Sequence, residues 1–269
     1  KDIYIATKTG STTVEDFWKD LETSLNNLKT DYIDIYQFHN PSFCPKPGDG
    51  TGLYEAMLEA KAQGKIHFIG LTNHRLPVAI EACESGLYDT IQFPFSYLAD
   101  QKDIDLVNKC KENNIGFICM KALSGGLINR SDAAYAYLAQ FDNVLPIWGI
   151  QKESELDEFI SYQTKAPELT QEIQDLIAHD RKELAGDFCR GCGYCMPCPK
   201  GIQINQCARM SLMLRRAPAA SWLNDHWQAE MKKIEECLNC GKCKQHCPYH
   251  LNTPKLLKKN YEDYKTFLK

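Results

Sequence analysis

Apolar and polar residues alternate along the first 165 residues in a repeating order of short and long segments. Short runs rich in Ile, Tyr and Phe are typical of buried strands, and longer runs with apolar residues every three or four positions are typical of amphipathic helices. The pattern predicts strands at residues 3–7, 33–39, 67–73, 90–97, 116–122 and 144–151. It predicts helices at residues 14–29, 52–64, 76–86, 103–114, 132–141 and 155–162. The sequence therefore predicts six strand-then-helix units.

Such repeated units require a parallel sheet covered by helices, either an open doubly wound sheet or a closed barrel. Polar residues end several predicted strands: Lys8, His39, Asn73, Gln92 and Lys121. A closed barrel gathers these ends at one mouth, where barrel enzymes carry out their chemistry, whereas an open sheet spreads them along an edge. We therefore expect an α/β protein with a (β/α)8 TIM barrel. Since six strands cannot close it, we expect strands 3 to 8 here and about 60 residues, two more units, before residue 1.

Eight cysteines stand in two bursts, "CRGCGYCMPCP" at residues 189–199 and "CLNCGKCKQHCP" at residues 237–248. Three thiolates spaced by three residues in a tight loop can surround one [4Fe-4S] cluster, and in two-cluster ferredoxins the fourth cysteine, followed by proline, binds the other cluster. One hypothesis is therefore that Cys247 completes the first set and Cys198 the second. Zinc is the alternative, but the layout favours iron–sulfur clusters. The expected ligands are Cys189, Cys192, Cys195, Cys198, Cys237, Cys240, Cys243 and Cys247.

The other cysteines are scattered singly along the chain. This distribution is not typical of a disulfide framework. Cys44, Cys83, Cys110 and Cys119 are expected to be small buried residues, and Cys207 is expected to be structural. Two helices are expected around and after Cys207, over residues 204–218 and 222–236.

The formal net charge of −4 is unevenly distributed. Residues 1–199 carry 18 Lys and Arg against 29 Asp and Glu, whereas residues 200–269 carry 13 against 6. Two clusters with their thiolates would bring about −2 each, which offsets much of the basic excess, so we expect no nucleic-acid partner. No run of about 18 apolar residues and no signal-like start is present, so we expect a cytoplasmic protein without a membrane partner.

Four signatures resemble the aldo-keto reductases from their third strand to their eighth: "IATKTG", "SLNNLKTDYIDIYQFHNP", "GKIHFIGLTNH" and "IQFPFSY". The cysteine-rich tail resembles the branch of that family whose C-terminal ferredoxin-like domain binds two [4Fe-4S] clusters. The resemblance implies a barrel over residues 1–165, a helical connector over 166–187 and a small, mainly helical dicluster domain over 188–269.

The resemblance also implies a catalytic group of Asp, Tyr, Lys and His, in which Tyr protonates a carbonyl oxygen while nicotinamide delivers hydride. Lys8 and His39 match the last two residues, and Tyr4 and Tyr36 stand at other positions, so the Asp and Tyr are expected in the missing units. A phenol with a pKa near 10 needs a nearby ammonium to act at neutral pH, which Lys8 would supply. His39 would orient the substrate oxygen, or it is a structural residue at a strand end.

The resemblance implies a nucleotide site as well. Asn73 and Gln92 match the positions that hold the nicotinamide carboxamide, although each can instead be a polar strand cap. Met120 stands where many members stack an aromatic ring. Glu155, in place of an arginine for the 2′-phosphate, favours NADH over NADPH, and Lys152 works against this. The expected nucleotide contacts are Asn73, Gln92, Met120, Gly149, Gln151, Lys152 and Glu155.

Three functions are open at this point. The first is NAD(P)H-dependent reduction of a small carbonyl compound, or oxidation of an alcohol, with the clusters structural or used for docking. In the second, the clusters exchange electrons with the barrel through flavin or a radical, and ferredoxin or another redox protein is the partner. The third is a non-catalytic electron carrier, in which Lys8 and His39 would have no role.

Overall fold

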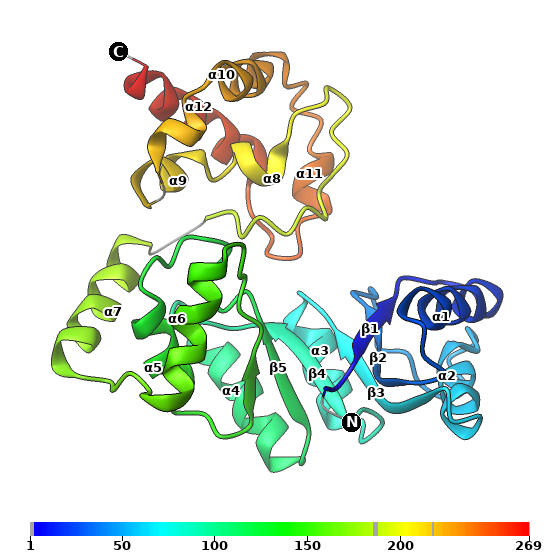
Figure 1. Ribbon diagram of the computed structural model, residues 1–269. Helices are drawn as coiled ribbons and strands as arrows, with labels where there is room; N and C mark the ends of the chain where they lie inside the picture. The colour runs from blue at the N-terminus through cyan, green and yellow to red at the C-terminus, as the bar shows by residue number, and fades with distance from the viewer. Residues whose placement is uncertain (1–2, 185–187, 217, 269) are drawn as a thin grey trace. The chain divides into compact units, whose positions relative to one another are not determined.

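The computed structural model describes residues 3–184, 188–216 and 218–268 (Figure 1). The chain divides into two compact units. The first, here called the sheet unit, comprises Lys1–Phe95, Ala99–Met120 and Phe141–Ile147. The second, here called the C-terminal unit, comprises Ser96–Leu98, Lys121–Gln140 and Trp148–Lys269. The last three residues of the expected connector, 185–187, lie outside the described residues.

The sheet unit contains one parallel sheet whose six strands follow their order in the sequence. The strands are β1 (Ala6–Thr9), β2 (Ile33–His39), β3 (Ile66–Thr72), β4 (Thr90–Pro94), β5 (Gly116–Met120) and β6 (Val144–Pro146). A doubly wound sheet reverses its strand order at a switch point, whereas a barrel adds each strand beside the previous one. The sequential order therefore confirms the predicted α/β fold of the TIM-barrel type.

A helix follows each strand, as predicted. The six helices are α1 (Val14–Leu28), α2 (Leu53–Ala62), α3 (Leu76–Glu84), α4 (Gln101–Glu112), α5 (Ser131–Leu138) and α6 (Glu153–Thr164). Helix α1 begins after Thr13, whose hydroxyl oxygen accepts the backbone N–H of Asp16, a standard N-cap. Phe17, Leu21 and Leu25 are its buried residues, which is the helical spacing read from the sequence.

The first strand begins and ends later than predicted, at Ala6–Thr9 in place of residues 3–7, and the last strand is shorter than predicted. Ile3 and Tyr4 are 68% and 79% exposed, and the ladder between β1 and β2 begins where Ala6 pairs with Ile35. The ladder between β5 and β6 ends at Pro146, although the apolar run continues to residue 151. Apolar alternation marks residues suited to a strand, but a strand also needs a neighbour whose backbone groups are in register.

The C-terminal unit also contains α7 (Gln171–Glu183) and a group of short helices. These are α8 (Ile204–Cys207), α9 (Met210–Arg216), η1 (Ala219–Trp222), α10 (Asp225–Lys232), η2 (Lys233–Glu236) and α11 (Lys242–Gln245), followed by α12 (Thr253–Phe267). The prediction of one helix over residues 204–218 is wrong, because Asn260 of α12 interrupts it. Asn260 donates to the carbonyl of Ala208 at 3.0 Å and accepts the N–H of Ser211 at 2.8 Å. The helix expected over 222–236 begins later, at α10, and ends in the 3-10 helix η2.

Helix α12, which no sequence pattern singled out, completes the core of this part of the chain. Leu257 and Tyr264 of α12 are each 1% exposed and belong to one apolar cluster with Met210 and Met231. Cys207 is fully buried in the same cluster, and Cys44, Cys83, Cys110 and Cys119 are buried as expected. Among the described residues, no helix combines the length and the apolar character that crossing a bilayer requires.

Candidate functional site

Lys8 and His39 project from the same face and the same edge of the sheet. Lys8 of β1 lies opposite Gln37 of β2 in the ladder, and His39 follows Gln37 by two residues, so its side chain points to the same side. Both Lys8 and His39 are exposed. The pKa of His39 is below its ordinary value, because neighbouring atoms remove part of its hydration and because the Lys8 ammonium repels an imidazolium. Both effects favour the neutral form of the His39 imidazole.

The polar row continues across the next two strands. His39 is in register with Thr72 of β3, and Thr72 is in register with Gln92 of β4. Gln92 accepts a hydrogen bond from Nε2 of Gln37 at 3.1 Å, and these two amides are 8% and 2% exposed. Gln37 was not singled out from the sequence, although its place in the alternation of β2 puts it on the His39 face. The edge of the sheet thus presents a cation, an imidazole and two linked amides.

Asn73 immediately follows β3, but its side chain is already engaged by the backbone. It is fully buried, and Nδ2 donates to the carbonyl of Pro41 at 2.9 Å. Its Oδ1 accepts the N–H groups of His74 at 2.9 Å and Arg75 at 2.8 Å. These bonds fix the turn between β3 and α3. The geometry therefore matches the strand-cap alternative more closely than a carboxamide contact.

Met120 ends β5, where its Cα pairs with that of Pro94. The hydroxyl of Thr72 donates weakly to the Met120 sulfur at 4.0 Å, so this thioether lies at the same edge as the polar row. Tyr36 points the other way. It is fully buried and packs edge-to-face on Phe17 of α1, with ring centroids 5.8 Å apart, so it cannot act as an acid beside Lys8.

The four residues expected after the last strand belong to the C-terminal unit. Gly149, Gln151 and Lys152 are exposed. Glu155 lies in the first turn of α6, and its Oε2 accepts the backbone N–H groups of Gln151 at 2.8 Å and Lys152 at 3.2 Å. The bond from the N–H of Lys152, the N-cap residue, is one half of a capping box, and it stabilises the start of the helix. Glu155 thus has a structural role in addition to the expected nucleotide contact.

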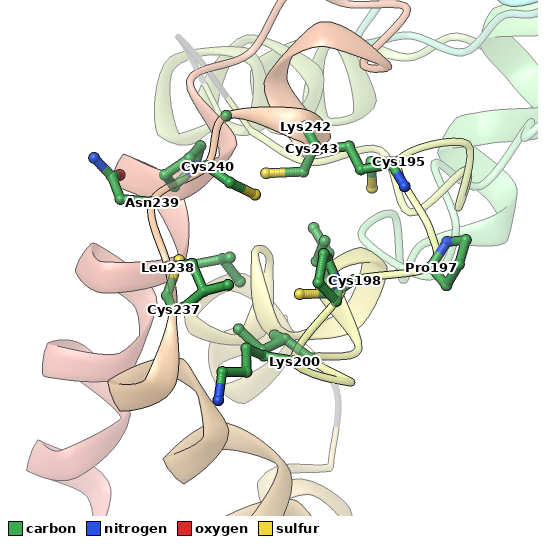
Figure 2. A pocket seen from close by; sticks show the side chains of 16 residues that line it. Cys195, Pro197, Cys198, Lys200, Cys237, Leu238, Asn239, Cys240, Lys242 and Cys243 are labelled. Atoms are coloured by element: carbon green, nitrogen blue, oxygen red, sulfur yellow. The ribbon is translucent and has the colours of Figure 1, made fainter.

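The eight clustered cysteines line two cavities of the C-terminal unit. The first cavity is lined by Cys189, Cys192, Cys195 and Cys247. The second is lined by Cys198, Cys237, Cys240 and Cys243, and Cys195 lines it as well. Each cavity therefore collects three cysteines of one burst and the last cysteine of the other. Figure 2 shows the sulfur atoms of Cys198, Cys240 and Cys243 turned toward one space.

The two cavities differ in charge and exposure. Cys240 is the exposed member of the second set, and Lys200 and Lys242 are the charged residues on that wall. The first cavity contains no exposed cysteine, and Arg190 is its charged lining residue. In the described ranges, no three His, Cys, Asp or Glu side chains converge closely enough to hold one metal ion.

The chemistry of the thiols fits a metal cofactor. Burial raises the pKa of Cys195 to about 12, and it also raises the pKa values of Cys189, Cys192 and Cys243. At neutral pH these thiols would keep their protons unless a metal replaced them, since metal ligation deprotonates cysteine. Four thiols around each cavity satisfy the ligand set of a [4Fe-4S] cluster, which is four cysteine thiolates.

The chain matches two family models. Residues 1–144 match the aldo/keto reductase family, and residues 188–252 match the 4Fe-4S dicluster domain. The chain is 37% identical over 116 residues to the methylglyoxal reductase DkgB of Salmonella typhimurium. The aligned stretch covers 39% of this chain and 41% of that protein. The chain is 31% identical over 114 residues to the NADH-specific methylglyoxal reductase of Escherichia coli, covering 42% of this chain and 35% of that protein. The chain thus spans about two fifths of the length of the curated relatives it matches.

Solved structures share the fold. An aldo-keto reductase of Bacillus halodurans in its apo form superposes with a TM-score of 0.55 at 21% identity, covering 66% of this chain and 71% of that one. A putative aldo-keto reductase of Pseudomonas aeruginosa superposes with a TM-score of 0.52 at 18% identity, and the match covers 60% of this chain and 66% of that one.

Proposed function

Because this chain belongs to the aldo/keto reductase family, we propose that its barrel is an NAD(P)H-dependent oxidoreductase for a small carbonyl compound or alcohol. We further propose that the C-terminal domain holds two [4Fe-4S] clusters. The observation that carries the second part is the pair of cavities, one lined by four cysteines and the other by five, with cysteines of both bursts in each and Cys195 in both.

The ligand sets follow the cavities. Cys189, Cys192, Cys195 and Cys247 would hold one cluster, and Cys237, Cys240, Cys243 and Cys198 the other. The crossing of the last cysteine of each burst is the arrangement of two-cluster ferredoxins. Cys195, which borders both cavities, is assigned to the first because Cys189 and Cys192, the two cysteines before it in the burst, line that cavity alone.

Cysteine variants test the crossed assignment. The wild-type protein, purified without oxygen, is expected to contain about eight iron and eight sulfide per chain. Cys198→Ala is expected to lower iron to about four per chain by emptying the cavity of the other burst. Cys207→Ala is the matched control, because this cysteine is buried between the bursts but lines neither cavity, and it should retain all the iron. Stoichiometric zinc without sulfide in the wild type would refute the cluster proposal.

The barrel chemistry would depend on Lys8 and His39. Bound nicotinamide would supply or accept the hydride at the substrate carbon. Neutral His39 can hydrogen-bond the substrate oxygen, and Lys8 would stabilise negative charge that develops at this edge and lower the pKa of a phenolic acid. Gln92 and Met120 would contact the nicotinamide end, and Gly149, Gln151, Lys152 and Glu155 stay predicted contacts of the nucleotide.

The names of the relatives support the substrate class and the choice of nucleotide. Two of them are named methylglyoxal reductases, and one of these is named NADH-specific. We therefore propose a small aldehyde or dicarbonyl substrate, with NADH preferred over NADPH. Glu155 agrees with that preference, since a carboxylate repels the 2′-phosphate of NADPH.

Turnover of methylglyoxal with NADH by the full-length protein tests the barrel proposal. Lys8→Met is expected to lower kcat by about 100-fold or more, the usual contribution of acid–base assistance. Lys102→Met removes an exposed lysine of α4 and is the control, with expected activity equal to that of the wild type. Equal activity in all three proteins would show that Lys8 takes no part in turnover.

The second candidate function, electron exchange between the clusters and the barrel, is favoured by the exposed Cys240. A cluster with an exposed ligand can pass single electrons to a soluble carrier such as ferredoxin. Nicotinamide moves two electrons together, so this function requires a converter such as flavin. Flavin absorbance in the anaerobic protein and reduction of the clusters by substrate would support it. Clusters that stay oxidised during NADH turnover would contradict it.

A further inference from the structure

Arg209 is a buried cation in the short break between α8 and α9. The residue is 8% exposed, and no carboxylate of the described residues forms an ion pair with it. Its Nη1 donates to the carbonyl of Gly125 at 2.9 Å, and its Nε donates to Oε1 of Gln206 at 3.3 Å. A buried charge normally requires a compensating partner, because removing it from water is costly. The neutral acceptors around Arg209 leave its positive charge uncompensated.

The structure makes room for this guanidinium with two glycines. Gly125 and Gly191 have φ values of +65° and +67°, which side-chain-bearing residues rarely adopt. A Cβ at Gly125 would lie 2.8 Å from Nη1 of Arg209, and one at Gly191 would lie 2.9 Å from the same atom. The side chain is thus enclosed by two backbone segments, one of which is the loop that carries the first cysteine burst.

The charge of Arg209 acts on the first cavity. Gly191 lies between Cys189 and Cys192, and its N–H donates to Sγ of Cys189 at 3.4 Å. The guanidinium of Arg209 therefore lies against the residue that hydrogen-bonds the Cys189 sulfur. A positive charge at this place favours negative charge on that sulfur. Because so little of Arg209 reaches water, its field is screened much less than that of a surface residue.

We propose that Arg209 is a positioning residue that raises the reduction potential of the cluster in the first cavity, by placing an uncompensated positive charge beside Cys189. Adding an electron to a cluster makes it more negative, and a nearby buried cation stabilises that state. Arg209 lies behind the loop of the first cavity and does not line it, whereas the cations of the second cavity, Lys200 and Lys242, line its wall and are exposed, so water screens their charge. The two clusters would accordingly differ in potential. This inference rests on the proposed cluster ligation.

A potentiometric titration followed by electron paramagnetic resonance tests the inference. The wild-type protein, Arg209→Gln and Arg209→Lys would be reduced stepwise with dithionite in the presence of mediator dyes. In Arg209→Gln, one of the two reduction waves is expected to move to lower potential, and the other to stay in place. Arg209→Lys keeps the charge and should show a smaller shift. Arg215→Gln is the control, since this arginine pairs with Asp263 at the surface and should shift neither wave.

Other outcomes are equally defined. An unshifted Arg209→Gln protein with full iron content overturns the inference, and so do equal shifts in the Gln and Lys variants, which would indicate a packing effect. If Arg209→Gln loses about half the iron and Arg209→Lys keeps it, the result supports a role for the positive charge. Equal loss of iron in both variants contradicts that role. A wild-type protein without iron would refute the cluster proposal itself. If the wild-type protein contains about eight iron per chain, the cluster proposal stands, and an unshifted potential then contradicts only the role of Arg209.

Discussion

Arg216 and Asp180 form a buried ion pair, with Nη2 2.8 Å from Oδ1 and side chains 7% and 4% exposed. Asp180 of α7 also accepts the hydroxyl of Tyr97, and Arg216 of α9 also bonds Glu183 at 2.6 Å and the carbonyl of Leu127 at 2.5 Å. This network joins α7, α9 and the chain before α5 within the C-terminal unit. It is the kind of satisfied buried network that fixes one arrangement of elements.

Breaking this pair is expected to be costly. Asp180→Asn leaves the Arg216 guanidinium with Glu183 as its remaining carboxylate partner and should destabilise the protein by about 1–3 kcal/mol. The measurement is the thermal unfolding midpoint of the anaerobic protein. Asp263→Asn, which breaks the surface pair with Arg215, is the control and should cost less than about 1 kcal/mol. Equal effects of the two variants would show that burial does not strengthen the Arg216 pair.

The pKa of His39 has two causes that a variant can separate. Desolvation is the larger cause of its lowering, and repulsion by Lys8 is the smaller one. Lys8→Met is therefore expected to raise the pKa of His39 only part of the way toward its ordinary value of about 6.5. Titration of the His39 ring protons by NMR measures this directly. A full return to the ordinary value would assign the whole shift to Lys8, and no change would show that the two side chains do not interact.

The same shift predicts how stability depends on pH. The folded-state pKa of His39 lies below the unfolded value, so the unfolded chain binds more protons once the pH falls below about 6.5. The free energy of unfolding should then decrease down to the folded pKa and be unaffected by His39 above this window. His39→Asn should flatten that part of the profile. An unchanged slope in denaturation curves between about pH 7.5 and 5 would contradict the lowered pKa.

Asn73 is predicted to matter more for stability than its candidate role in nucleotide binding suggests. Asn73→Ala would remove the side-chain acceptor of the Arg75 N–H, the donor to the Pro41 carbonyl and one of the two acceptors of the His74 N–H, at a cost of about 1–3 kcal/mol. Asn26→Ala, at an exposed position of α1, is the control and should be nearly neutral. Denaturant unfolding and the KM for NADH would be measured together. A higher KM with unchanged stability would instead support a carboxamide contact.

Glu155 combines a helix cap with a candidate charge effect, and two variants separate them. Glu155→Gln can still accept the backbone N–H groups, so stability should be kept while the KM for NADPH falls relative to that for NADH. Glu155→Ala should lose about 1 kcal/mol of stability as well. Glu153→Gln, in the same helical turn, is the control for removal of a charge. An unchanged nucleotide preference in Glu155→Gln would show that the Glu155 carboxylate does not repel the 2′-phosphate of NADPH.

Local patterns predicted the repeated units well because they depend on neighbouring residues. The buried stripe Phe17, Leu21 and Leu25 follows from the 3.6-residue period of a helix, and β2 occupies residues 33–39 as predicted. The helix expected over residues 204–218 failed for the opposite reason. Its break is made by Asn260, which is 52 positions from Ala208 and which no local period can reveal.

The candidate sites show the same division. Cysteine spacing alone predicted eight ligands and suggested that the bursts exchange their last members, and the cavities bring those same sets together. The places of Lys8 and His39 at the carboxyl ends of predicted strands led to the expectation that both lie at one mouth of a barrel. By contrast, nothing in the sequence marked Gln37 or Arg209, because a glutamine in a predicted strand and an arginine in a predicted helix are ordinary residues until their surroundings are known.

The amino-acid sequence by itself therefore determined the α/β class, the order of the six units, the thiol-rich tail and the family resemblance, since each depends on residue type and short spacing. Only the tertiary structure decided that Asn73 is held by backbone groups, that Tyr36 faces α1, and that Arg209 is buried against the loop of Cys189, with no carboxylate of the described residues paired to it. The physical reason is that burial and bonding partners depend on which distant segments meet, and those meetings set the hydration and the electric field of each side chain.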